Sequence, residues 1–194
     1  MIEKPTGNHS QKFIIQDGCH CPEDPPWHST VSKITALPIL FFFGIGAFGV
    51  AHLGYVYFFV WLVLAGIKIY GIRYLVCARC PYYGKNCSSF FGKLVPFMHK
   101  KQENKSMIIG LWIDTLFWGI LFLYPLYYFL QYKMYGFTIL YCLSFLLMVG
   151  TITRLACIIC PLTICPVGKM GRIYWRILGL KINDSQLKKT EKIH

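Results

Sequence analysis

Cys77-Ala-Arg-Cys80-Pro81 and Cys157-Ile-Ile-Cys160-Pro161 decide the fold, because each stretch closes a pair of long apolar runs. A third cysteine follows each stretch, Cys87 in the first case and Cys165 in the second. The spacing is Cys-x2-Cys-Pro-x5-Cys the first time and Cys-x2-Cys-Pro-x3-Cys the second. The pattern predicts that one unit, a helical hairpin followed by a cysteine-rich loop, occurs twice.

The apolar runs predict an integral membrane protein. Of the 194 residues, 55% are hydrophobic and only 14% are charged. The run 34–76 is too long for one crossing, since a transmembrane helix needs about 20 apolar residues, and it suits two helices hinged at His52-Leu53-Gly54. A second pair begins near Met107, turns at 133–136 and returns to about Ala156. We therefore expect an all-α fold with four transmembrane helices in two repeated hairpins.

The chain divides into four segments on this basis. Residues 1–33 form an N-terminal segment that contains Cys-His-Cys-Pro, and 34–105 hold the first hairpin and its cysteine loop. Residues 106–180 hold the second hairpin, its cysteine loop and an interfacial helix, and 181–194 form a polar tail. The interfacial helix is predicted over Gly168–Leu180, because Lys169, Arg172 and Arg176 recur at helical spacing among apolar residues.

The distribution of basic residues predicts the orientation. The net charge is +12, and the two short turns on one side of the predicted bundle carry only Lys133. By the positive-inside rule the cysteine loops and both termini are cytoplasmic, as in a cell inner membrane. The basic side then suits the bilayer surface and an acidic protein partner. Nucleic acid is not an expected partner, because no helix-turn-helix or aromatic-basic reading surface is visible.

The predicted location of the cysteines points to metal binding. Persistent disulfides are rare in a reducing compartment, and thiolates at Cys-x2-Cys spacing suit zinc or iron–sulfur clusters. The third cysteine of each loop and the proline after Cys80 and Cys160 favour iron–sulfur. Each loop offers three ligands, and Cys19 and Cys21 would supply one more to each, which makes two [4Fe–4S] clusters. The predicted ligands are Cys77, Cys80, Cys87, Cys157, Cys160, Cys165, Cys19 and Cys21. The alternative is one zinc ion shared by Cys77, Cys80, Cys157 and Cys160.

Three further polar residues fall inside or beside the predicted spans. Lys68 and Asp114 lie at matching depth from the cysteine side, so we expect an ion pair between them. The pair would serve either as a proton relay or as a lock between two helices. His52, at the opposite turn, is a candidate contact for a quinone headgroup.

The layout resembles the four-span membrane subunit of the quinol-dehydrogenase modules that feed periplasmic nitrate reductases. The matching residues are Cys77, Cys80-Pro81, Cys157 and Cys160-Pro161, after the second and fourth spans. Such proteins take electrons from quinol and usually carry iron–sulfur clusters in a ferredoxin-like segment. This chain departs from them in two ways: its first cysteine pair is separated by two residues rather than three, and it has no C-terminal ferredoxin segment.

The sequence thus predicts a membrane-anchored iron–sulfur electron-transfer subunit. It would link a cytoplasmic acidic redox protein, such as a ferredoxin or flavoprotein, to a quinone or another membrane redox protein. Its small size suggests one component of a larger oxidoreductase complex, and no catalytic residue is assigned. The alternative is a non-redox membrane adaptor whose loops hold a structural zinc ion.

Overall fold

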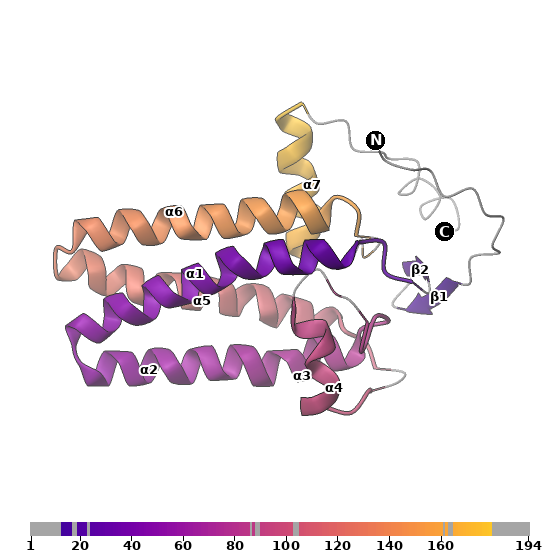
Figure 1. Cartoon of the computed structure of the whole chain (residues 1–194), viewed down its shortest axis with the longest axis horizontal. Helices are drawn as coiled ribbons and strands as arrows, with labels where there is room; N and C mark the ends of the chain where they lie inside the picture. The colour runs from indigo at the N-terminus through magenta and orange to yellow at the C-terminus, as the bar shows by residue number, and fades with distance from the viewer. Residues whose placement is uncertain are drawn as a thin grey trace.

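Four long helices form the body of the molecule (Figure 1). The structure is a computed structural model that describes residues 13–16, 19–22, 24–85, 87, 90–102, 105–160, 162 and 165–179. The predicted polar tail, 181–194, lies outside these residues. The four long helices within them are long and apolar enough to cross a membrane, and they cover Ser29–Leu53, Tyr55–Arg79, Ile108–Gln131 and Tyr135–Cys157. The prediction of four helices long and apolar enough to span a membrane is therefore confirmed.

The second and fourth spans change their helical geometry toward one end. The second runs from α2 (Tyr55–Gly66) through a π-helical turn, η1 (Ile67–Gly71), and α3 (Ile72–Val76) to a short 3₁₀ turn, η2 (Cys77–Arg79). The fourth runs from α6 (Tyr135–Ile152) into a π-helical turn, η4 (Thr153–Cys157). Such π-helical turns are rare and occur often at functional sites. Here one contains Lys68 and the other ends on Cys157.

Two tight turns close the hairpins where the sequence predicted them. The first span, α1 (Ser29–Leu53), meets α2 at the single residue Gly54, whose φ of 134° strongly favours glycine. The third span, α5 (Ile108–Gln131), meets α6 through the short turn Tyr132–Met134. Both turns lie at the same end of the bundle, at the left of Figure 1.

The first span begins earlier than the predicted Ile34, at Ser29. The His28 ring nitrogen accepts a hydrogen bond from the backbone N–H of Thr30, at 3.3 Å, and so caps the helix. The first turn is therefore polar and lies outside the apolar stretch that hydropathy detects.

Aromatic side chains and glycines hold the bundle together. The rings of Phe42 and Tyr141 stack 4.8 Å apart where α1 packs along α6. The Phe129 ring lies against Gly49, and a β-carbon on that glycine would overlap it. On α5, Gly110 faces the second span, and a β-carbon there would lie 2.7 Å from the carbonyl oxygen of Leu75. Small residues of this kind let membrane helices approach closely.

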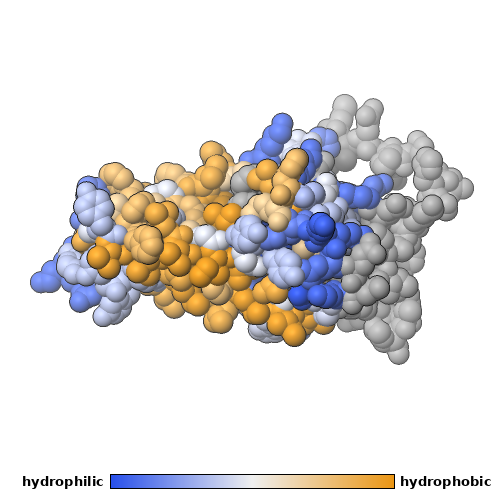
Figure 2. Space-filling view, turned by 90° about the horizontal axis from the view of Figure 1, so that it is seen from below, coloured by the Kyte–Doolittle hydropathy of each residue, from blue (hydrophilic) through white to orange (hydrophobic). Residues whose placement is uncertain are grey.

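The surface is divided into zones along the bundle. A hydrophobic band covers its middle, and hydrophilic residues gather toward both ends (Figure 2). Exposed leucine, isoleucine and phenylalanine side chains on all four spans form this band. An apolar band of this kind is what a bilayer covers.

Short elements collect at the end opposite the two tight turns (Figure 1). They are β1 (Phe13–Gln16), β2 (Cys19–Pro22), η3 (Phe90–Lys93), α4 (Val95–Met98) and α7 (Pro166–Ile177). The strands pair antiparallel, with Ile14 opposite Cys21, and form a hairpin that the sequence did not predict. The helix α7 matches the predicted amphipathic segment and runs across the bundle rather than along it (Figure 1).

Candidate functional site

Helix ends position the cysteines of both loops. Cys77 begins η2 at the end of the second span, and the backbone N–H of Cys80 donates back to the Cys77 carbonyl at 3.3 Å. Cys157 closes η4 at the end of the fourth span. Cys165 caps α7, since its carbonyl accepts the first helical hydrogen bond, from the N–H of Lys169 at 2.9 Å. The paired cysteines thus follow a helix in each loop, and the last cysteine of the second loop precedes one.

Cysteines of the two loops lie close to one another. Cys80 interacts electrostatically with Cys77 and Cys87 of its own loop and with Cys160 of the other. Cys160 in turn interacts with Cys157, Cys165 and Cys87. None of the eight cysteines whose side chains are described forms a disulfide. The fold therefore gathers six thiols from two distant parts of the sequence at one end of the bundle.

Cys21 joins this group from the N-terminal hairpin. Its side chain is completely buried, in a cluster with Trp27, Tyr82 and Leu162. The half-buried thiols of Cys80, Cys160 and Cys165 pack against the same cluster. The other predicted N-terminal ligand, Cys19, lies in β2, but its side chain is outside the described residues.

Burial sets the protonation of the thiols outside the spans. It raises the pKa of Cys80 well above the usual thiol value, and the neighbouring Cys87 adds to this rise. Burial likewise raises the pKa values of Cys160 and Cys165. It also raises the pKa of the Tyr82 phenol, which lies beside Cys21 and Cys160. Metal binding at these thiols would thus require the release of protons.

The donor set suits a soft metal or a cluster in its chemistry, but its present arrangement does not form a coordination site. Within the part of the chain that the structure describes, no three His, Cys, Asp or Glu side chains are grouped closely enough to hold one metal ion. Binding at either loop would therefore require its sulfurs to move closer together. The cysteines lie on short turns, which permit such movement more readily than a long helix does.

Two arginines bring positive charge to the thiols. Arg73 Nη1 donates to Cys77 Sγ at 3.7 Å. Arg172 is buried, and its Nη1 donates to the Cys157 carbonyl at 3.3 Å while its charge also acts on Cys165. The sequence did not single out Arg172 for this role, because its helical spacing placed it with the basic face of α7.

Other basic residues near the loops have different partners. Arg79 donates to the side chain of Gln102 and to the Ser106 carbonyl, each at 3.1 Å. Lys85 pairs with Asp24 at 3.3 Å, on the exposed surface. Arg154 lies over the Trp175 ring, 5.2 Å from its centre.

The predicted ion pair between Lys68 and Asp114 is present. Lys68 Nζ lies 2.5 Å from Asp114 Oδ1, and it also donates to the Asp114 carbonyl at 3.2 Å. The Lys68 side chain is 1% exposed and Asp114 is 19% exposed. Asp114 also interacts electrostatically with Cys77, Cys165 and Arg73. The pair therefore lies directly on the membrane side of the thiols.

His52 lies far from this group, near the end of α1 that joins α2 (Figure 1). It is exposed, and its ring contacts those of Phe48 and Phe137, with centres 4.6 Å and 5.9 Å away. His52 and the cysteines therefore lie at opposite ends of the bundle, too far apart for direct contact.

The spans and the thiol group together define a four-span helical membrane protein with a cysteine cluster at one end. Comparison with known proteins found no matching family model, no matching curated protein and no matching solved structure.

Proposed function

We propose that this protein is a membrane-anchored electron-transfer subunit whose two cysteine loops hold iron–sulfur clusters. The observation that carries the proposal is the gathering of seven thiols at one end of the bundle: Cys21, Cys77, Cys80, Cys87, Cys157, Cys160 and Cys165. Clusters of this kind are held by cysteine thiolates and transfer single electrons. Two sets of three thiols, one from each loop, favour two clusters over one, with Cys21 and the predicted ligand Cys19 completing the sets.

The protein's own residues would adjust such clusters through charge and burial. Arg73 contacts the Cys77 thiol from within the second span, and Arg172 contacts the Cys157 carbonyl from α7. Positive charge and hydrogen bonds next to thiolate ligands stabilise the more reduced state and raise the reduction potential. The apolar neighbours Trp27, Leu162 and Met107 limit the access of water.

The Lys68–Asp114 pair gives the proposal a candidate route for charge or protons between the thiols and the membrane interior. The pair lies between the thiols and the interior of the bilayer, so it is placed to stabilise charge changes or to relay a proton to a quinone. The basic residues of the cysteine side suit a cytoplasmic acidic redox partner. Other subunits of a membrane complex would then supply the catalytic site, as the resemblance to quinol-dehydrogenase modules implies.

The test is anaerobic purification of the full-length protein, with iron, sulfide and zinc measured per chain. We expect a brown protein with absorption near 400 nm, an electron paramagnetic resonance signal on reduction, and about eight iron atoms. Cys80→Ser and Cys160→Ser should each remove about half of the iron if each loop holds its own cluster. Cys142→Ser is the matched control, since Cys142 lies within α6 and should leave the iron unchanged.

Two results would contradict the proposal. A colourless, iron-free protein that contains about one zinc ion would identify the non-redox adaptor with a structural zinc site. Loss of all iron from either loop variant would indicate a single shared metal centre instead of two clusters. The approach of Cys80 to Cys160 is the observation that makes a shared centre worth testing.

A further inference from the structure

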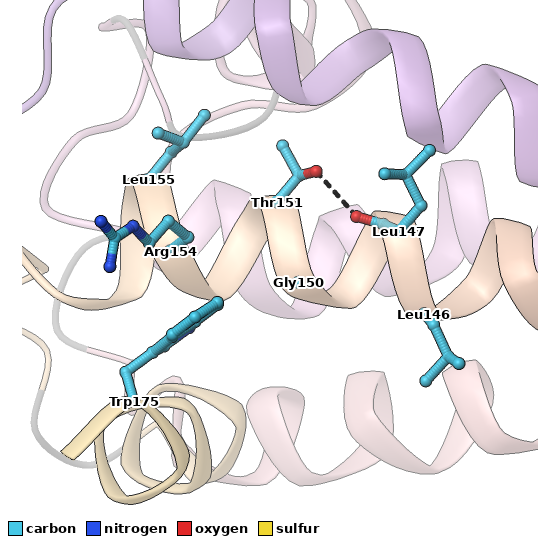
Figure 3. Close-up of a pocket in the computed structure, with 7 residues that line it drawn as sticks. All are labelled: Leu146, Leu147, Gly150, Thr151, Arg154, Leu155 and Trp175. Atoms are coloured by element: carbon cyan, nitrogen blue, oxygen red, sulfur yellow. Dashed lines mark hydrogen bonds between the residues drawn. The ribbon is translucent and has the colours of Figure 1, made fainter. Parts of the chain in front are cut away.

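A groove lies on the outer face of the fourth span, where α7 crosses it (Figure 3). Its volume is about 430 Å³, and it is lined by α6, η4 and one side chain of α7. It is shallow and open to the surroundings, so it suits a ligand that lies along the helix rather than one enclosed in a pocket. The groove is separate from the cysteine cluster, because none of the predicted ligands lines it.

The inner part of the groove is apolar and open. Leu146 and Leu147 are 65% and 57% exposed along its wall. Gly150 leaves a gap between these leucines and the outer part of the groove. Apart from its chain neighbours and the backbone of its own helix, nothing lies within 4 Å of the place where its β-carbon would be. The Thr151 hydroxyl donates to the Leu147 carbonyl at 2.7 Å, so its proton is already used within the helix (Figure 3). This part suits a hydrocarbon chain.

The outer part of the groove carries one positioned cation. The exposed Arg154 guanidinium lies 5.2 Å from the centre of the Trp175 ring (Figure 3). Trp175 is itself fixed, because its Nε1 donates to Thr153 Oγ1 at 3.0 Å. Among the described residues, the two ion pairs involve other side chains, so no carboxylate neutralises Arg154 there.

The docking of α7 makes this arrangement rigid. A β-carbon on Gly171 would lie 2.8 Å from Thr153 Cγ2, so only a glycine lets α7 approach this closely. The bond from Arg172 to the Cys157 carbonyl adds a second attachment. The fold thus holds Trp175 in place before any ligand binds, and Arg154 lies over its ring.

We propose that this groove binds one anionic phospholipid. Its acyl chain would lie along Leu146, Leu147 and Gly150, and its phosphate would meet Arg154. A guanidinium binds phosphate oxygens in pairs, which favours a phospholipid over a quinone, whose head carries no phosphate. The cation lies at the end of the span, beside the amphipathic helix that crosses it, so head and chain match their usual depths in a bilayer. The site does not depend on the proposed clusters.

The experiment is native mass spectrometry of the full-length protein in a neutral detergent, titrated with dioleoylphosphatidylglycerol or dioleoylphosphatidylcholine. We expect one phosphatidylglycerol molecule per chain, bound about fivefold more tightly than phosphatidylcholine. Arg154→Gln should weaken phosphatidylglycerol binding about tenfold, because a charge-assisted hydrogen bond is lost. Gly150→Leu should abolish this binding by filling the groove.

Matched controls separate the groove from general attraction to anionic lipid. Lys169→Gln removes the same charge from the exposed surface of α7 and should change the affinity less than about twofold. Gly119→Leu adds the same side chain at another open glycine and should have no effect. If Arg154→Gln does not fold, Arg154→Lys keeps the charge without the paired geometry and should give an intermediate affinity.

Three results would overturn the proposal. Equal effects of Lys169→Gln and Arg154→Gln would show unspecific attraction, and equal binding of the two lipids would show no use of the anionic charge. Displacement of phosphatidylglycerol by an equimolar amount of ubiquinone would assign the groove to a quinone instead.

Discussion

Lys68 Nζ lies 2.5 Å from Asp114 Oδ1 and 4.2 Å from the centre of the Trp118 ring, and so joins the second and third spans by a buried charge. Removing one partner leaves the other charge uncompensated, which costs about 3–5 kcal/mol in buried pairs. We expect Asp114→Asn to destabilise the protein more than Lys68→Met, because Lys68 is the more deeply buried partner. The Lys68→Met/Asp114→Asn double variant should be more stable than either single variant.

Thermal unfolding in detergent measures this order of stabilities. Lys133→Met, at the exposed turn between α5 and α6, serves as the control for loss of a lysine. Additive losses in the double variant would contradict a direct interaction, since independent sites add within a few tenths of a kcal/mol.

Gly110 should be intolerant of even one added methyl group. A β-carbon there would lie 2.7 Å from the Leu75 carbonyl oxygen, which belongs to the backbone and cannot turn away. We expect Gly110→Ala to cost about 1–3 kcal/mol by forcing the second and third spans apart. Gly119→Ala on the same helix has open space and should be neutral or stabilising. Equal melting temperatures for the two variants would argue against this close approach.

The metal-free protein should lose stability as the pH rises above the usual thiol range. Burial raises the pKa values of Cys80 and Cys160 in the folded state, so the unfolded chain releases these protons first. The protonated thiols therefore contribute fully to the free energy of unfolding below the ordinary thiol pKa of about 8.5. This contribution declines as the pH rises from there toward the folded-state pKa. Urea unfolding between pH 7 and pH 10 measures the effect. Cys80→Ala/Cys160→Ala should flatten the decline, and an unchanged slope would show that these thiols do not cause it.

Cys21 tests whether the N-terminal hairpin takes part in metal binding. Its side chain is 0% exposed and lies beside Tyr82, between the loops. We expect Cys21→Ala to reduce the iron per chain by about half, because a [4Fe–4S] cluster ordinarily has four cysteine ligands. Cys142→Ala removes a thiol from the interior of α6 and should retain all the iron. Full iron in Cys21→Ala would assign Cys21 to packing alone.

The orientation can be tested with engineered cysteines at exposed positions. Lys133→Cys lies in the turn between α5 and α6, and Lys100→Cys follows α4 at the opposite end. In intact cells a membrane-impermeant maleimide should label Lys133→Cys, whereas Lys100→Cys should need permeabilised cells. Mass spectrometry of the labelled peptides gives the readout. The reverse pattern would place the thiols outside the reducing compartment and remove the argument against disulfides.

The spans were predictable because hydropathy and turn chemistry act locally. The hinge at His52-Leu53-Gly54 and the turn near Lys133 are both found, since a bilayer fixes helix length and glycine permits the sharp change of direction. The ion pair of Lys68 with Asp114 followed from depth alone, because two buried charges inside a membrane need each other.

The cysteine end was less predictable because its arrangement depends on contacts between distant segments. The repeat indicated that the two loops lie near each other, but nothing in the spacing indicates that Cys21 is buried in a strand hairpin beside them. The inward direction of Arg172 also depends on the close fit of Gly171 against Thr153, which periodicity does not reveal. The groove at Gly150 arises from the missing side chain of one residue and the crossing of another helix.

The one-residue connection at Gly54 and the short turn at Tyr132–Met134 limit the surface that the end of the bundle opposite the cysteines offers to other proteins. They leave that face without a loop long enough to offer a soluble protein a binding surface. A soluble protein that binds this chain is therefore expected to use the cysteine face, where the longer connecting segments and short elements lie.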